Sequence, residues 1–254
     1  ADTIYRIASC SKTFASAAVM QLQDAGLLSI DDDVTNTVPA FSLLPRYPDQ
    51  AITIRELLAH QAQLPGCYFR HADSTTPYAG YYDLSLALLA EDYLIEPRGF
   101  LEKYNNNGFT LIEGVVAGAN TNGLDYAGYA SARLFAPMGM SNTTFRLTGG
   151  QTNLLAKVYR NGALAPDEQV NTPGSGGAYS TAADLARYAR FLLGYGTHDG
   201  VTILSSNAVA VLWADQSDRV ALVNKEGYAK SGLGWDQIED TSFAYAGKRS
   251  EEHT

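Results

Sequence analysis

The chain has 254 residues, 46% hydrophobic and 18% charged, which supplies a substantial core and fits one large or two small domains. The net charge of −9 argues against a nucleic-acid partner, which needs clustered Lys and Arg, and against adhesion to anionic lipid. No apolar run reaches the length of a membrane span. The two cysteines, Cys10 and Cys67, form either one bridge or, as we prefer, two small buried hydrophobic side chains.

The predicted elements of the first third are helical. Residues 10–25 are good helix formers with apolar residues at three- and four-residue spacing, and Gly26 fits a C-terminal stop. The acidic run 31–33 predicts a solvated turn rather than a metal site. Thr53 and Glu56 fit a capping box that opens a short helix, IRELLAH.

The rest of the chain alternates loops and helices. Residues 66–82 predict a long irregular loop, and 146–178 carry turn signals that include a hairpin turn at Asn161-Gly162 and a flexible stretch, PGSGGAYS. Thr181 with Asp184 fits another capping box, for a helix that ends at Gly194. Further helices are expected over 83–94, 107–119, 124–135 and from Ser205 or Ser206 to Trp213.

Neither end has the features of a natural terminus. The first residues open without Met and run straight into a helix. The last six, 249–254 (RSEEHT), break the preceding pattern, and we interpret them as a non-native tail after a domain over 1–248, with a natural polar tail as the alternative. On either interpretation, His253 belongs to no site.

The strongest candidate for chemistry is Ser9-Cys10-Ser11-Lys12 at the start of the first helix. A serine hydroxyl is a weak nucleophile until a neighbouring base takes its proton. A lysine three residues later lies on the same helix face, so its amine can reach the hydroxyl. The helix start favours developing negative charge, and Lys12 is expected to be partly desolvated. Alone, Ser-x-x-Lys is a weak pattern that also fits a polar helix start with a surface lysine.

Longer stretches make this motif more specific. The segment YRIASCSKTFASAAVMQLQDAGLLSIDD resembles the nucleophile helix of the penicillin-binding-protein-like serine hydrolases, which include class C β-lactamases, D-alanyl-D-alanine carboxypeptidases and family VIII esterases. ITIRELLAHQAQLPG resembles the next segment, although Gln61-Ala62-Gln63 replaces the usual Thr-Ser-Gly. YNNNGFTLIEGVVAGA resembles the family's Tyr-x-Asn motif. Similar landmarks follow in the family's order: LFAPMGMSNTTF, GGAYSTAADLARYARFLLGYG and GLGW.

The resemblance implies a role for each matched residue. Ser9 would attack a carbonyl and become acylated, and its backbone N–H would form half of the oxyanion hole. Lys12 and Tyr104 would move the proton from the hydroxyl to the leaving group, and the sequence does not decide how they divide the task. Asn106 would hydrogen-bond the substrate. The implied partner is a small-molecule or peptide substrate, and no metal or cofactor is expected, because no zinc or nucleotide motif is present. A periplasmic or extracellular location would fit the family.

The implied fold is α+β, of the β-lactamase/transpeptidase type. We expect most of its helical domain to be present, and its α/β sheet domain to be cut at both ends, so that the chain is mostly helical. The family's third motif, Lys-Thr/Ser-Gly, is expected beyond Lys248, although Lys230-Ser231-Gly232 fits it literally. We also expect the isolated chain to be poorly stable and inactive by itself.

Other interpretations of the same residues are weaker. Tyr159-Arg160-Asn161 also fits Tyr-x-Asn but precedes a turn rather than a helix. A Ser-His-Asp triad lacks the Gly-x-Ser-x-Gly elbow, so His60 is interpreted as structural. Three functions remain open: hydrolysis of amide, β-lactam or peptide bonds, hydrolysis of small esters, and a catalytically silent binding or sensor module.

Overall fold

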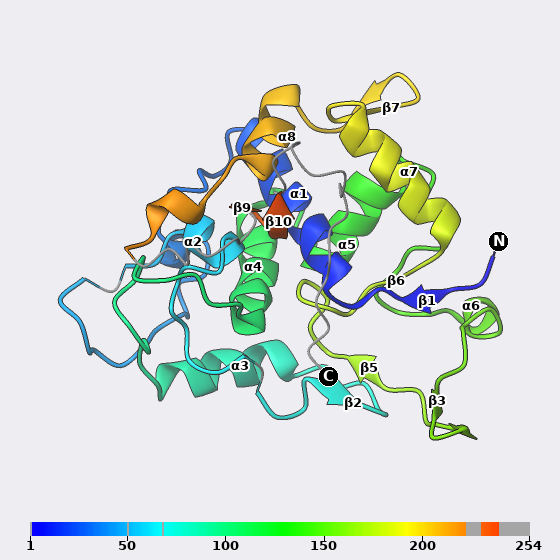
Figure 1. The fold of residues 1–254 in the computed structure, drawn as a ribbon, viewed down its shortest axis with the longest axis horizontal. Helices are drawn as coiled ribbons and strands as arrows, with labels where there is room; N and C mark the ends of the chain where they lie inside the picture. Colours follow the sequence, from blue (N-terminus) through cyan, green and yellow to red (C-terminus); the bar gives the residue numbers. More distant parts are fainter. Residues whose placement is uncertain (1, 50, 68, 222–229, 239–254) are drawn as a thin grey trace.

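The computed structural model describes residues 2–49, 51–67, 69–221 and 230–238. Helices dominate the described chain, as expected (Figure 1). The α-helices are α1 (Ser11–Asp24), α2 (Ile54–Leu58), α3 (Tyr81–Ala90), α4 (Asn106–Ala119), α5 (Tyr126–Ala130), α6 (Gly149–Thr152), α7 (Ala182–Leu193) and α8 (Ser206–Trp213). Tighter or wider turns are η1 (Ala8–Cys10), η2 (Val34–Asn36), η4 (Ser217–Arg219) and the π-helical η3 (Ser131–Phe135).

The described strands are short and pair only in twos, all antiparallel. They are β1 (Tyr5–Arg6) with β6 (Tyr179–Ser180), β2 (Asp73–Ser74) with β5 (Gln169–Val170), β3 (Tyr159–Arg160) with β4 (Ala163–Leu164), β7 (Thr197–His198) with β8 (Val201–Thr202), and β9 (Lys230–Gly232) with β10 (Trp235–Ile238). The β1–β6 pair places Tyr5 opposite Ser180 and thereby joins the start of the chain to the segment before α7.

Helix α1 is the centre of the core. Figure 1 shows it in the middle of the molecule, where it packs against α4, α5 and α8. It buries 10 of its 14 residues, so the single apolar face expected from the sequence was too narrow. Three alanines, Ala15, Ala17 and Ala18, are fully buried and let neighbouring helices approach closely, while Phe14 makes edge-to-face contacts with Phe135 and Tyr188.

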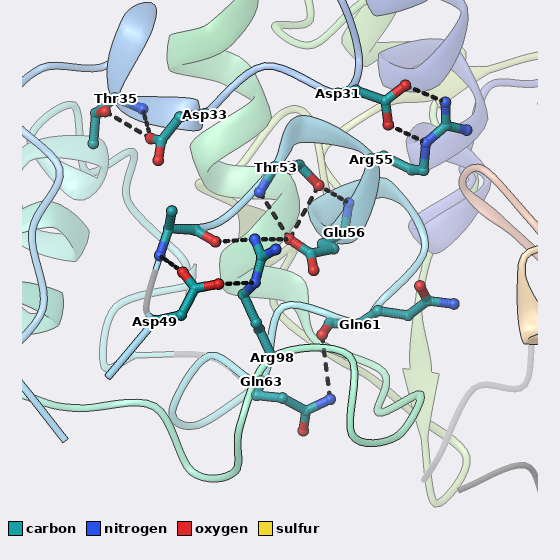
Figure 2. Close-up of polar contacts among 11 residues, drawn as sticks. Asp31, Asp33, Thr35, Asp49, Thr53, Arg55, Glu56, Gln61, Gln63 and Arg98 are labelled. Carbon is teal, nitrogen blue, oxygen red and sulfur yellow. Dashed lines mark hydrogen bonds and ion pairs between the residues drawn. The ribbon is translucent and has the colours of Figure 1, made fainter. Parts of the chain in front are cut away.

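The predicted helix starts are confirmed where a side chain accepts hydrogen bonds from the free backbone N–H groups. The Thr53–Glu56 capping box opens α2 as predicted (Figure 2). Ser205 caps α8, and Thr181 caps α7. At α7 the reciprocal half of the box is replaced, because the Asp184 carboxylate instead accepts hydrogen bonds from Asn142 N and Thr143 Oγ1. None of the described helices is long and apolar enough to cross a bilayer.

Candidate active site

Ser9 lies in η1, a single 3-10 turn that leads directly into α1. The preceding Ala8 has a φ of +43°, a left-handed conformation that residues other than glycine adopt rarely. Ser11 holds this turn from below: its Oγ donates to the Ala8 carbonyl at 2.7 Å and accepts from Ala178 N at 3.0 Å. The turn that presents Ser9 is therefore fixed by contacts from a segment far along the chain.

Three polar atoms meet at this turn and form what we call the Ser9–Lys12–Tyr104 triangle. Ser9 Oγ lies 2.5 Å from the phenol oxygen of Tyr104 and 3.0 Å from Lys12 Nζ, and the lysine amine lies 2.5 Å from the same phenol oxygen. Lys12 is 1% exposed, which agrees with the expected desolvation. The arrangement lets a proton move between an alcohol, an amine and a phenol without crossing bulk water.

Tyr104 reaches the triangle because of the start of helix α4. Asn105 is the N-cap, and its side chain accepts hydrogen bonds from the backbone N–H groups of Asn107 and Gly108. Its amide group also donates to the Leu64 carbonyl at 2.8 Å, which ties the cap to the segment after α2. The first asparagine of the YNNNG stretch is thus structural, and the second, Asn106, begins the helix.

A sharp turn over residues 60–63 packs against Tyr104 and the chain that precedes it. His60 and Gln63 both have positive φ values, and their carbonyl oxygens accept hydrogen bonds from the chain that leads to Tyr104. The His60 ring lies 4.5 Å from the Tyr104 ring, centroid to centroid, and its Nδ1 accepts from Asn105 N. Burial, and then the charge of Lys12, lowers the pKa of His60 to about 3, so its imidazole stays neutral. The structural interpretation of His60 agrees with these contacts.

Segment 172–178 contributes a site group that the sequence did not reveal. The Ser175 carbonyl oxygen accepts a hydrogen bond from Lys12 Nζ at 2.7 Å, and the Ala178 carbonyl accepts from Ile7 N. Thr172 and Ser175 are fully buried, so the flexible stretch expected here is instead packed against the nucleophile turn. The expectation failed because glycines that permit flexibility also permit close backbone approach.

Asn106 lies in the first turn of α4, two residues after Tyr104. Its Nδ2 donates to Cys67 Sγ at 3.0 Å, and its Oδ1 is buried without a hydrogen-bond partner within the described chain. Cys10 and Cys67 form no disulfide with each other, and Cys67 is exposed whereas Cys10 is half-buried. The interpretation of both cysteines as small buried side chains is therefore wrong for Cys67, and Cys10 is less buried than that interpretation predicts.

The other sequence matches have contacts of their own. Ser231, the middle residue of the literal third-motif match, lies in strand β9, and its Oγ donates to Glu102 Oε2 at 2.5 Å. Tyr159 lies in the predicted β3–β4 hairpin. Lys248 and the tail 249–254 lie outside the described residues.

The acidic run forms ordinary surface contacts. Asp31 pairs with Arg55, and Asp33 caps η2 by accepting from Thr35 N (Figure 2). Among the residues with described positions, no group of His, Cys, Asp or Glu side chains could hold a metal ion.

Comparison with known proteins assigns the chain to a family. The family model described as Beta-lactamase matches residues 1–248. AmpH of Escherichia coli K12, a D-alanyl-D-alanine-carboxypeptidase/endopeptidase, is 25% identical over 240 residues, which cover 92% of this chain and 60% of AmpH. Beta-lactamase-like protein 4 of Dictyostelium discoideum is 30% identical over 207 residues, which cover 76% of this chain and 36% of that protein.

Solved structures agree with the fold. A Yersinia pestis beta-lactamase/D-alanine carboxypeptidase, solved with citrate, superposes with a TM-score of 0.73 at 25% identity, over 92% of this chain and 66% of that one. A class C beta lactamase from Rhodobacter sphaeroides superposes with a TM-score of 0.69 at 20% identity, over 92% and 61%. The β-lactamase/transpeptidase-like fold expected from the sequence is confirmed. This chain spans less than two thirds of the length of these relatives.

Proposed function

We propose that this chain, which belongs to the beta-lactamase family, is a serine hydrolase that acts through an acyl-enzyme on Ser9. The observation that carries the proposal is the Ser9–Lys12–Tyr104 triangle, whose three polar atoms come from two separate stretches of chain and lie 2.5–3.0 Å apart. Hydrogen-bond contact between a nucleophile and its base is the geometry that such catalysis needs.

In the proposed reaction, Tyr104 takes the proton of the Ser9 hydroxyl as Oγ bonds to the substrate's carbonyl carbon. The ammonium group of Lys12 favours negative charge on the phenol oxygen 2.5 Å away, which is what Tyr104 needs to act as a base. The carbonyl oxygen becomes an oxyanion, for which the Ser9 N–H is one donor. The bond to the leaving group then breaks, the leaving group takes the proton from Tyr104, and the acyl group stays on Ser9.

A water molecule completes the cycle. It gives one proton to Tyr104 and attacks the acyl carbon, and the ester bond to Ser9 breaks. The serine oxygen recovers its proton from Tyr104, so the enzyme returns to its starting state. We assign direct proton transfer to Tyr104 because Lys12 already donates to Ser9, Tyr104 and the Ser175 carbonyl, which match the three protons of an ammonium group.

We favour amide, β-lactam or peptide bonds as the substrate class. The name of the AmpH relative, a carboxypeptidase and endopeptidase, supports this choice. The Oδ1 of Asn106 has no partner among the described residues, so a side-chain rotation that exposes it would supply an acceptor for an amide N–H of the substrate. Small esters would use the same triangle without needing that acceptor.

Two covalent probes test the proposal on the full-length protein that carries these residues. A fluorescent penicillin reports on β-lactam-type acylation, and a fluorophosphonate reports on a reactive serine of any hydrolase. The Ser9→Ala variant removes the nucleophile, and Ser16→Ala, at a fully buried serine of helix α1, serves as the control. Labelling should vanish in Ser9→Ala and persist in Ser16→Ala.

The pattern of labelling separates the candidate functions. Penicillin labelling at Ser9 supports the favoured substrate class, and fluorophosphonate labelling alone supports an esterase. Labelling by neither probe would contradict the hydrolase proposal and support a silent binding module.

A further inference from the structure

We propose that Glu113 is a positioning residue that fixes the Ser175 carbonyl against the amine of Lys12. This inference rests on the proposed hydrolase function, because the position of Lys12 matters only if the triangle moves protons. Glu113 lies in helix α4, nine residues after Tyr104, within the stretch that resembles the family's second motif but outside its Tyr-x-Asn residues.

The evidence begins with two hydrogen bonds from segment 172–178 to a single carboxyl oxygen. Glu113 Oε1 accepts from Thr172 Oγ1 at 2.8 Å and from Gly174 N at 2.9 Å. Thr172 Oγ1 also lies 2.9 Å from Thr110 Oγ1, one helical turn earlier on α4. Three contacts therefore bind the start of the segment to the helix that carries Asn106 and follows Tyr104.

The segment has little room to move away from this position. A Cβ atom at Gly174 would lie 2.7 Å from the Phe109 carbonyl oxygen and 3.0 Å from Glu113 Cγ, so the backbone packs directly on α4. The next residue, Ser175, supplies the carbonyl that accepts from Lys12 Nζ at 2.7 Å. Glu113 and the lysine amine are thus connected through one stretch of backbone, the four residues from Thr172 to Ser175.

Burial explains why a carboxyl group can serve here. Desolvation raises the pKa of Glu113 to about 8, although its hydrogen bonds to Gly174 and Thr172 act in the opposite direction. At neutral pH the side chain is mainly the uncharged acid, so it holds the segment as a hydrogen-bond acceptor without placing a full negative charge near Lys12. A glutamine has the same shape and the same acceptor oxygen.

Variants of the full-length protein test this role through the rate constant of fluorophosphonate labelling. Glu113→Ala removes both hydrogen bonds, and we expect the rate constant to fall by about 10- to 100-fold, because small misplacements of catalytic groups have effects of that size. Glu113→Gln should stay within about 2-fold of the wild type, because it keeps the acceptor. Thr172→Val removes one of the two bonds to Glu113 together with the contact to Thr110, and its rate constant should fall between those of the two Glu113 variants.

A matched control separates positioning from general loss of stability. Asp184 is another buried carboxyl group that accepts two hydrogen bonds from a loop, at Asn142 N and Thr143 Oγ1, but it holds a different part of the fold. Asp184→Ala should reduce the amount of folded protein and leave the rate constant of the folded fraction unchanged. Equal rate constants in Glu113→Ala and wild type, or equal losses in Glu113→Ala and Asp184→Ala, would overturn the role of Glu113.

The same experiment keeps the two proposals distinct. Absence of labelling in the wild type would contradict the hydrolase function, whereas labelled wild type with an unchanged Glu113→Ala contradicts the positioning role alone. A crystal structure of Glu113→Ala gives a readout independent of activity. A Ser175 carbonyl still within hydrogen-bonding distance of Lys12 Nζ would overturn the inference, and a displaced carbonyl would support it.

Discussion

Helix α1 and segment 172–178 both contact the Lys12 amine, but they contribute to the site in different ways. Helix α1 and the turn before it supply two side chains, Ser9 just before the helix start and Lys12 within it. The sequence motif predicts the chemistry of these side chains. Segment 172–178 supplies a backbone carbonyl from Ser175, and any residue could have provided it. Side-chain chemistry can be found by motif, whereas backbone chemistry depends on what fixes the backbone in place.

Among variants other than Ser9→Ala, the largest effect should come from removing the hydroxyl of Tyr104, which both side chains from the α1 region contact. Tyr104→Phe keeps the ring that packs on His60 and removes only the hydroxyl that contacts Ser9 and Lys12. We expect fluorophosphonate labelling to slow by about 10²- to 10⁴-fold, the usual contribution of a general base.

Tyr188→Phe is the matched control for this prediction. It removes a buried hydroxyl on helix α7 that donates to the carbonyl of Thr13, the residue after Lys12 in helix α1, and that lies outside the triangle. A Tyr104→Phe variant that labels as fast as Tyr188→Phe would move the base role from Tyr104 to Lys12.

The attachment of segment 172–178 through Glu113 predicts a free energy of unfolding that depends on pH. The pKa of Glu113 is raised from 4.5 to about 8 in the folded state, so the folded protein holds a proton that the unfolded chain has released between these values. The free energy of unfolding should therefore fall as pH rises from about 4.5 to about 8, by at most ~5 kcal/mol.

Denaturant unfolding of wild type and Glu113→Gln across this pH range checks the prediction. The variant has no proton to lose, so its stability relative to the wild type should increase with pH and level off above about 8. A constant difference between the two proteins from pH 5 to pH 9 would show that Glu113 has an ordinary pKa, and that it holds segment 172–178 as an ion.

The smallest effect should come from a part of the fold that contacts neither region's catalytic groups. Thr53→Ala removes one half of the capping box of α2 and should lower the free energy of unfolding by about 1 kcal/mol. Thermal unfolding measures this loss, and the labelling rate constant should not change. A slower rate would mean that α2 positions Tyr104 through the turn at residues 60–63, and would extend the supporting structure beyond segment 172–178.

The sequence predicted those parts of the site and fold that depend on local side-chain chemistry. Spacing predicted that Lys12 reaches Ser9, the capping residues located the starts of α2, α7 and α8, and Asn161-Gly162 located a hairpin. The ordered landmarks predicted the fold, and they predicted that Tyr104 lies beside Ser9.

The remaining features depend on contacts across long sequence separations. Ser175 meets Lys12 across 163 residues, and the glycine-rich stretch around it carries the same local signals as a free loop. Glu113 gave no signal, because an isolated glutamate on a helix is ordinarily a surface residue. The exposed position of Cys67 also depends on how a long loop packs, which spacing does not encode.

The central claim, that Ser9 is the nucleophile of the triangle, has one direct test. The full-length protein is labelled with a fluorophosphonate and digested with trypsin, and the modified peptide is sequenced by tandem mass spectrometry. Cleavage after Arg6 and Lys12 isolates the segment 7–12, which holds Ser9 and Ser11. The adduct should lie on Ser9 and be absent from Ser9→Ala. An adduct on Ser11 or on another peptide, undiminished in Ser9→Ala, would contradict the claim.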